Sequence, residues 1–392
     1  MEFELTEEQL SVKEAAREFT QQELLPGVIE RDREMKHPTD QVRKMGEMGF
    51  LGMMVSPEYG GGGMDTLSYV LAMEEISKVD SSCSVIMSVN NSLVCWGLEE
   101  YGNAEQKLKY LPRLASGEWI GSFCLSEPEA GSDATSQRTT AIDMGDHYLL
   151  NGTKNWITNG GKSSLHLVIA QTHAEKGHRG INVLIVESSW PGVTIGAKED
   201  KLGIRASDTH TIMYTDVKVP KENRIGEDGF GFKFAMKVLS GGRIGIAAQA
   251  LGIAAGAYEL AVKYSKEREA FGKPISQHQA IAFKLADMAT EIEAARLLVY
   301  RAAWMKDQGM DYTSAAAMAK LFASEVAMKQ TVEAIQVHGG YGYVKEYHVE
   351  RLMRDAKITQ IYEGTSEMQR IVISRNILNG QLYEPLWKTE TV

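Results

Sequence analysis

Cysteine is scarce in this chain, which has 392 residues and only three of them, Cys83, Cys95 and Cys124. Their number is odd and their spacing fits no metal site, so we expect reduced, buried thiols and no bound metal. The sequence also lacks a long uncharged apolar run, and we expect no membrane-spanning helix. The N-terminus has neither the basic start nor the apolar block of a signal peptide. These absences predict a cytoplasmic protein, or one of the mitochondrial matrix if a transit peptide has been removed.

Positive charge is also in deficit. Lys and Arg number 42 against 52 Asp and Glu, which gives a formal net charge of −10, whereas nucleic-acid-binding proteins are normally basic. No Gly-x-Gly-x-x-Gly motif occurs, which argues against a nicotinamide-binding Rossmann domain. The glycine run at residues 60–63 is not followed by Lys-Ser or Lys-Thr, so we interpret it as a surface loop and not as a P-loop.

The order of local patterns predicts a mainly α protein with a central β domain. Residues 1–120 show helical periodicity, with Thr6 as the N-cap of the first helix. Residues 121–229 contain short β-forming runs without intervening helices, which favours a small antiparallel, barrel-like β domain. Residues 230–392 are helical again, and apolar residues recur at spacings of four and three from 281 to 302. We expect three domains with these boundaries, the last of them a four-helix bundle.

The predicted strands of the β domain cover residues 120–125, 139–142, 148–150, 165–171, 181–187 and 211–219. Asn151-Gly152 follows the third of these strands and precedes Asn155-Trp156-Ile157. Because Asn and Gly both tolerate positive φ, this pair predicts a tight β-hairpin.

One carboxylate is notable for its neighbours in Gln360-Ile361-Tyr362-Glu363-Gly364-Thr365-Ser366-Glu367. Burial against the adjacent Ile and Tyr would raise the pKa of Glu363 toward neutrality, which suits a base that takes a proton from carbon. Gly364 would let the backbone approach a ligand closely. The alternative interpretation is a plain helix start, with Thr365 or Ser366 as N-cap and Glu367 in the first turn. The two interpretations are compatible, because helix N-termini also bind phosphates.

Other stretches carry weaker signals. Segment 124–133, Cys-Leu-Ser-Glu-Pro-Glu-Ala-Gly-Ser-Asp, offers backbone amides and two hydroxyls to a polar planar ligand, or is an ordinary turn. Trp156 would stack on an aromatic cofactor or fill the core of the β domain. Arg243 and Arg268 suit a diphosphate or a surface ion pair. His338 has no second ligand at metal spacing, so we assign it no metal and no catalytic role.

Taken together, these stretches resemble the acyl-CoA dehydrogenase family over nearly the whole chain. Segments 124–133, 336–355 and 360–367 are similar to three characteristic stretches of that family, in the expected order and spacing. Segments 86–93 and 198–205 are most similar to the short-chain, butyryl-type members. The resemblance implies FAD as cofactor, lying between the β domain and the bundle. It also implies oxidation of a short-chain acyl-CoA to the trans-2-enoyl-CoA, with Glu363 taking the α-proton while hydride passes to the flavin.

The resemblance also implies roles for individual residues. The implied FAD contacts are Phe123, Leu125, Ser126, Gly131, Ser132, Trp156, Ile157, Thr158, Arg268, Gln279, Gln336, Val337, Gly339, Gly340, Thr365 and Glu367. The implied substrate contacts are Ser132, Ser240, Gly241, Arg243 and Gly364. In the family, the residue matching Arg268 reaches the FAD diphosphate from a neighbouring subunit. A homotetramer and electron-transfer flavoprotein as electron acceptor are therefore implied as well.

Two features of the sequence bear on close alternatives. Isovaleryl-type members carry their glutamate immediately before the arginine that matches Arg243, where this chain has Gly242, so the base is expected at Glu363. Ser240-Gly241-Gly242 departs from the usual short-chain Asp-Met-Gly and is similar to branched-chain relatives, which keeps a branched short-chain acyl-CoA as an alternative substrate. An acyl-CoA oxidase would be expected to be longer, and a non-catalytic acyl-CoA-binding relative would be expected to lack the base.

Overall fold

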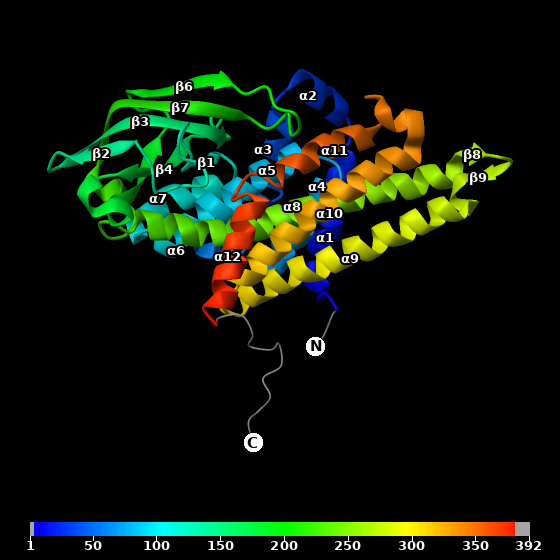
Figure 1. Ribbon diagram of the computed structural model, residues 1–392. Helices are drawn as coiled ribbons and strands as arrows, with labels where there is room; N and C mark the ends of the chain where they lie inside the picture. The colour runs from blue at the N-terminus through cyan, green and yellow to red at the C-terminus, as the bar shows by residue number, and fades with distance from the viewer. Residues whose placement is uncertain (1–3, 381–392) are drawn as a thin grey trace.

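The computed structural model describes residues 4–380 and follows the expected order of helices, then strands, then helices (Figure 1). The predicted last domain extends to residue 392, so its final part lies outside the described residues. Thr6 caps the first helix as predicted: its side chain accepts the N–H of Gln9, and the side chain of Gln9 accepts the N–H of Thr6. The first helices are α1 (Glu7–Phe19), α2 (Val28–Glu34), α3 (Thr39–Glu47), α4 (Thr66–Ser77), α5 (Ser81–Ser88), α6 (Trp96–Tyr101) and α7 (Ala104–Ala115).

A seven-stranded sheet forms the central part and lies at one end of the molecule (Figure 1). Its strands are β1 (Gly121–Cys124), β2 (Thr140–Asp143), β3 (His147–Thr158), β4 (Leu165–Gln171), β5 (Ile181–Glu187), β6 (Val193–Lys198) and β7 (Thr209–Pro220). The strand order is β1-β4-β2-β3-β7-β6, with β5 also paired to β4. The sheet is mixed, because β4 runs parallel to β1 and β2 whereas the remaining pairs are antiparallel. The predicted purely antiparallel arrangement is wrong in this detail, and β6 was not predicted.

The hairpin predicted at Asn151-Gly152 is wrong. β3 continues through both residues, and the chain turns earlier, at Gly145, whose φ is 98°. Gly152 instead marks a register shift in the pairing of β3 with β7. A β-carbon there would lie 2.5 Å from Oγ1 of Thr139, so the close approach of a neighbouring segment requires this glycine.

Long helices build the C-terminal part: α8 (Gly231–Glu267), α9 (Gln279–Asp307), α10 (Thr313–His338), α11 (His348–Ile358) and α12 (Ser366–Leu378). In Figure 1, α8, α9 and α10 run side by side away from the sheet, and the short hairpin of β8 (Glu269–Ala270) and β9 (Lys273–Pro274) lies at their far end. The predicted apolar stripe of α9 faces the core, since its buried residues are Met288, Ile292, Ala295, Val299, Ala302 and Ala303.

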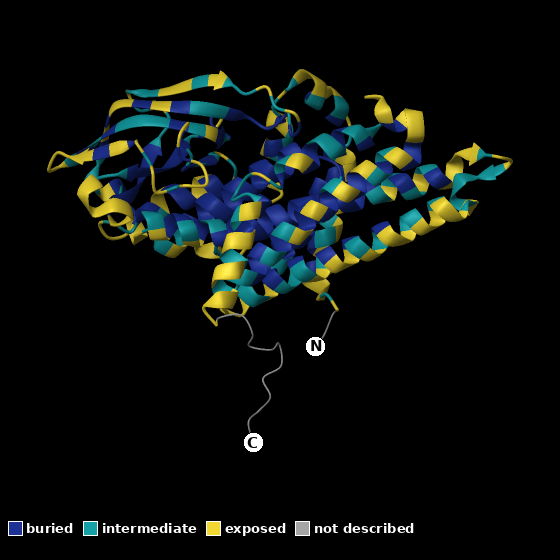
Figure 2. Cartoon of the chain, in the orientation of Figure 1, coloured by how far each residue is buried: buried dark blue, intermediate teal, exposed yellow. Residues whose placement is uncertain are grey.

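The central helix of the core is α8. It is the one helix among residues 4–380 that is long and apolar enough by composition to cross a membrane, with a mean hydropathy of 1.3 over its best 18-residue window. The helix is not a long uncharged run, because Arg243 and Glu259 interrupt its apolar part. In this window 83% of the residues are buried inside the protein, which accounts for their apolar character (Figure 2). The three cysteines are free and buried, as predicted.

Candidate active site

Glu363 lies in the connection between α11 and α12 and has an unusual backbone. Its φ is 52° and that of Gly364 is 93°, so two successive residues have left-handed conformations. This conformation costs roughly 1–2 kcal/mol for a residue with a β-carbon, so the surrounding structure must hold Glu363 in place. The predicted helix start is confirmed at the same point. Thr365 is the N-cap of α12, its side chain accepts the N–H of Met368, and Glu367 lies in the first turn.

The carboxyl group of Glu363 is buried. Its Oε2 atom has no hydrogen-bond partner among the described residues, although the residue as a whole is half-buried. Burial raises the pKa of Glu363 to about 7, while the positive charges of Lys320 and Arg243 partly oppose this rise. A carboxylate with a pKa near 7 is a stronger base than an ordinary glutamate and is still half ionised at neutral pH.

Helix α8 forms the wall against which this carboxyl group lies. A β-carbon on Gly242 would lie 2.2 Å from Glu363 Oε2 and 2.7 Å from a methyl carbon of Leu93. The next residue, Arg243, is 8% exposed, and its Nε atom has no partner within residues 4–380. The hydroxyl of buried Tyr69 is likewise without a hydrogen-bond partner in that range. Unsatisfied buried polar groups of this kind are rare in proteins and mark a place where a polar ligand can bind.

The backbone that carries Glu363 is held by buried side chains that the sequence did not reveal. The Gly364 carbonyl accepts hydrogen bonds from Lys320 Nζ at 2.7 Å and from Gln369 Nε2 at 2.8 Å. On the other side, the Tyr362 hydroxyl donates to Gln249 Oε1. One signal was available: Lys320 continues the apolar spacing of Ala316, Ala323 and Ala327 on an alanine-rich helix, and a lysine on a buried stripe requires a partner.

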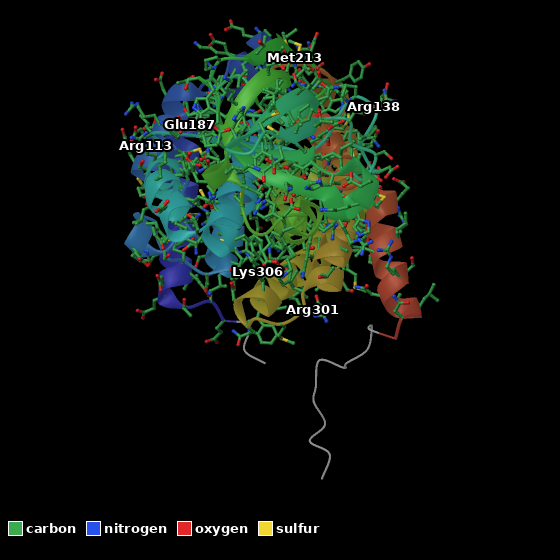
Figure 3. All side chains as sticks on the ribbon, turned by 90° about the vertical axis from the view of Figure 1, so that its left-hand side faces the viewer. Arg113, Arg138, Glu187, Met213, Arg301 and Lys306 are labelled. Atoms are coloured by element: carbon green, nitrogen blue, oxygen red, sulfur yellow. The ribbon has the colours of Figure 1, made fainter. Side chains whose placement is uncertain are left out.

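A buried ion pair shapes the loop between β1 and β2. Lys154 Nζ, on β3, lies 2.7 Å from Glu127 Oε1 and also donates to the Leu125 carbonyl at 2.9 Å. Glu127 accepts the backbone N–H groups of Arg138 and Thr139, so one pair fixes both ends of the loop. In Figure 3, Arg138 lies on the side of the C-terminal helices, opposite the side that carries Arg113 and Glu187.

The predicted cofactor residues of the β domain surround this loop. Phe123 and Leu125 belong to one hydrophobic cluster with Leu93 and with Tyr362, the neighbour of Glu363. The predicted contacts outside this cluster range from buried Ile157, through half-buried Ser126 and Thr158, to exposed Gly131 and Ser132.

Trp156 does not fill the core of the β domain. Its side chain is 61% exposed and its backbone φ is 61°, whereas the next residue, Ile157, is 2% exposed. Exposure of an indole beside a loop rich in backbone amides fits the binding of a planar aromatic ligand, which would cover that surface. The residues of this region thus fit a flavin. Among the described residues no group of three metal-ligating side chains comes together.

The predicted substrate residues Ser240, Gly241 and Arg243 flank Gly242, the position on α8 against which the carboxyl group lies. Ser240 is 9% exposed, and its hydroxyl donates to the Met236 carbonyl of its own helix at 3.0 Å. A β-carbon on Gly241 would meet only the hydroxyl of Tyr312, at 3.8 Å, so there is free space on that side of α8.

A second set of predicted cofactor residues lies at the far end of the helices. Arg268 follows Gly242 by 26 residues on a helix that rises about 1.5 Å per residue, so the two Cα atoms are roughly 39 Å apart. Arg268 lies over the ring of Tyr341, and His338 stacks on Tyr264. The members of this set are Arg268, Gln279, Gln336, Val337, Gly339 and Gly340. Within one chain the structure does not bring them to Glu363.

Comparison with known proteins places the chain in a family. The sequence profiles of the acyl-CoA dehydrogenase N-terminal, middle and C-terminal domains match residues 6–118, 122–217 and 229–378. The short-chain-specific acyl-CoA dehydrogenase of Clostridium acetobutylicum is 51% identical, with 96% of this chain and 100% of that protein covered. The human mitochondrial short-chain-specific acyl-CoA dehydrogenase is 49% identical, with 96% and 92% covered.

Solved structures agree with these sequence relationships. Butyryl-CoA dehydrogenase from Megasphaera elsdenii superposes with a TM-score of 0.95 at 48% identity, and 96% of this chain and 100% of that chain are covered. A chain described under electron transferring flavoprotein of Acidaminococcus fermentans has the same TM-score and the same coverage at 52% identity. The protein belongs to the acyl-CoA dehydrogenase family, and it is an FAD-dependent oxidoreductase with the fold of that family. The predicted family, fold class and cofactor are thereby confirmed, whereas the domain boundaries and the individual site residues stay predictions.

Proposed function

We propose that this enzyme oxidises a short-chain, butyryl-type acyl-CoA to the trans-2-enoyl-CoA, with Glu363 as the base. The buried carboxyl group of Glu363, whose Oε2 has no hydrogen-bond partner within residues 4–380, carries this proposal, because its pKa of about 7 lets it accept the α-proton at neutral pH. The names of the relatives, which are short-chain or butyryl-CoA dehydrogenases, support the substrate class. When bound, FAD supplies the acceptor for the β-hydrogen, which leaves with its electron pair.

The residues around Glu363 support proton removal in three ways. Leu93 and the bare backbone of Gly242 keep the carboxyl group against an apolar wall, which maintains its raised pKa. Arg243 places a positive charge near the Glu363 carboxylate. The backbone N–H of Glu363 donates to no acceptor within residues 4–380, and so it can donate to the thioester oxygen as negative charge develops there.

A branched short-chain acyl-CoA is the second candidate substrate. The free space beside Gly241 favours it, because a methyl branch would need room next to α8. One methylene changes binding by only ~1–3 kcal/mol, so turnover must be compared directly between butyryl-CoA, isobutyryl-CoA and 2-methylbutyryl-CoA. A higher kcat/KM for one of the branched thioesters would show that this thioester, and not butyryl-CoA, is the preferred substrate.

The position of the second set of predicted FAD residues supports a site shared between copies of the chain. We infer a homotetramer in which Arg268 of one subunit contributes to the cofactor site of another, since about 39 Å separates it from Gly242 of its own chain. We also propose electron-transfer flavoprotein as the electron acceptor, supported by the description of one similar structure. A cytoplasmic or mitochondrial-matrix location is proposed with it, in line with the mitochondrial relatives.

The first experiment adds butyryl-CoA anaerobically to the purified enzyme and records the visible flavin absorbance. Bleaching of the oxidised band by about one equivalent is expected for wild type, and Glu363→Gln should retain FAD but lose several orders of magnitude in the rate of bleaching. Glu105→Gln is the control, because Glu105 is an exposed glutamate on α7. If the flavin of Glu363→Gln bleaches at nearly the wild-type rate, Glu363 is not the base. A protein without a flavin band would support a non-catalytic binding role instead.

A further inference from the structure

Lys320 is a buried cation that the proposed chemistry leaves unexplained. It lies on α10, its side chain is 0% exposed, and no carboxylate lies within ion-pair distance of it among the described residues. A fully buried lysine without such a partner is rare, because the loss of hydration of the ammonium group is costly. Its Nζ instead donates to the carbonyl of Gly364 at 2.7 Å.

That carbonyl lies at the most strained part of the loop. Glu363 and Gly364 have φ values of 52° and 93°, and the peptide that follows them is held by both Lys320 and Gln369. Gln369 is also 0% exposed. Two buried donors on one carbonyl oxygen fix the orientation of the peptide plane, and with it the direction in which the Glu363 side chain leaves the backbone.

The charge of Lys320 also acts on the carboxyl group. The groups that face Glu363 are Lys320 from α10, Arg243 from α8, Tyr69 from α4 and the adjacent Tyr362, and those that face Lys320 also include Glu325 and Glu367. Of the two cations, Lys320 favours the ionised form of Glu363 more strongly. Burial lowers the pKa of Lys320 to about 8, so it stays mostly protonated where Glu363 titrates.

We propose that Lys320 is a positioning residue for Glu363: it fixes the loop through the Gly364 carbonyl and keeps the carboxylate ionised without touching it. The proposal rests on the proposed role of Glu363 as base. Lys320 then contributes in two ways. Its hydrogen bond to the Gly364 carbonyl sets the geometry of the loop, and its charge sets the pH range in which Glu363 is ionised.

The test compares Lys320→Met and Lys320→Gln with Lys329→Met, in FAD-loaded enzyme. Methionine removes both the charge and the hydrogen bond, whereas glutamine removes the charge and keeps a donor for the Gly364 carbonyl. Lys329 lies on the same helix but is exposed and paired with Glu291, so it controls for loss of a lysine from α10. The measurements are the pH profile of kcat/KM and the infrared band of the protonated Glu363 carboxyl, identified by its absence in Glu363→Gln.

The acidic limb of kcat/KM, and the midpoint of the infrared band, should move about one pH unit to higher pH in both Lys320 variants, since a nearby opposite charge shifts a pKa by ~1–3 units. Lys320→Met should also lose about tenfold in the limiting kcat, and Lys320→Gln less. Superimposable profiles for wild type and both variants would overturn the proposal, and if one variant does not fold, the other makes the same comparison. If Glu363→Gln is active, the base assignment fails. If that variant is inactive while the Lys320 profiles do not move, only the role of Lys320 fails.

Discussion

Gly242 and Glu363 compete for the same space: a β-carbon on residue 242 would lie 2.2 Å from Oε2 of Glu363. Glycine inside a helix costs roughly 0.5–1 kcal/mol relative to alanine, so its presence in the middle of α8 calls for a reason. The carboxyl group provides one, because it reaches the wall of α8 only where a side chain is missing. A glutamate at position 363 and a side chain at position 242 are therefore mutually exclusive in this arrangement.

Gly242→Ala should accordingly impair catalysis more than folding. The new methyl group must displace the Glu363 carboxylate, and a misplacement of about 1 Å can cost on the order of 100-fold in rate. We expect kcat to fall by roughly that factor while FAD is retained, as measured by steady-state turnover and flavin absorbance. Gly241→Ala is the comparison, since its β-carbon would make only an ordinary contact at 3.8 Å and should cost much less. Equal kcat values for the two variants would contradict the steric argument.

The raised pKa of Glu363 also affects the stability of the fold. The ionised form that the proposed base requires is the form that destabilises the folded enzyme. In the folded enzyme its pKa is about 7, above the value near 4.3 of an exposed glutamate, so the native state binds the proton more tightly than the unfolded state. The free energy of unfolding therefore falls as pH rises from about 4.3 to 7. Glu363→Gln removes this titration, so it should raise Tm at pH 8 and raise it much less at pH 5.5. Calorimetry at the two pH values measures the difference, and an equal change in Tm at both would show that Glu363 titrates normally.

The buried pair of Lys154 and Glu127 leads to a prediction about the cofactor loop. Lys154→Met leaves Glu127 as an uncompensated buried charge, which typically costs ~3–5 kcal/mol. It should lower the denaturant midpoint of unfolding and weaken FAD binding together, because the same side chain holds the Leu125 carbonyl. Adding Glu127→Gln should recover part of the stability but not the FAD affinity, since the loop would still lack its cation. Full recovery of both would show that the pair is not needed to shape the loop.

Local sequence signals predicted the starts of helices correctly, but they did not predict features that depend on contacts between distant segments. The Thr6 cap and the helix start at Thr365 depend on a few neighbouring residues, and both were predicted correctly. Asn151-Gly152 was interpreted as a hairpin because the pair has the residues of a tight turn, but pairing of β3 with β7 and the proximity of Thr139 decided otherwise. Tertiary contacts outweighed turn propensity there.

The same distinction applies to the candidate site. The raised pKa of Glu363 was predicted correctly, but the expected burial against Ile361 is wrong, since Ile361 is 48% exposed and the carboxyl group lies against α8 at Gly242. The spacing of Lys320 on its alanine-rich helix indicates that it is buried, but its partner, and the role of Gln369, depend on the packing of α10 against α12, which no local pattern records. The exposure of Trp156 likewise depends on where β3 ends in the sheet. Contacts between distant segments are the part that the sequence alone could not supply.

The separation of about 39 Å between Arg268 and Gly242 of one chain allows a direct test of a site shared between subunits. Glu363→Gln removes the proposed base, and Arg268→Glu places a negative charge where a diphosphate is proposed to bind, so each variant alone should have little activity. In a mixed oligomer, a subunit with intact Glu363 can meet a partner with intact Arg268, which rebuilds a complete site. Co-expressed and co-purified variants should therefore recover a substantial part of wild-type activity, in particles whose mass by light scattering exceeds one chain. No recovery in verified mixed oligomers, or a monomeric mass for the active enzyme, would mean that each chain forms its site alone.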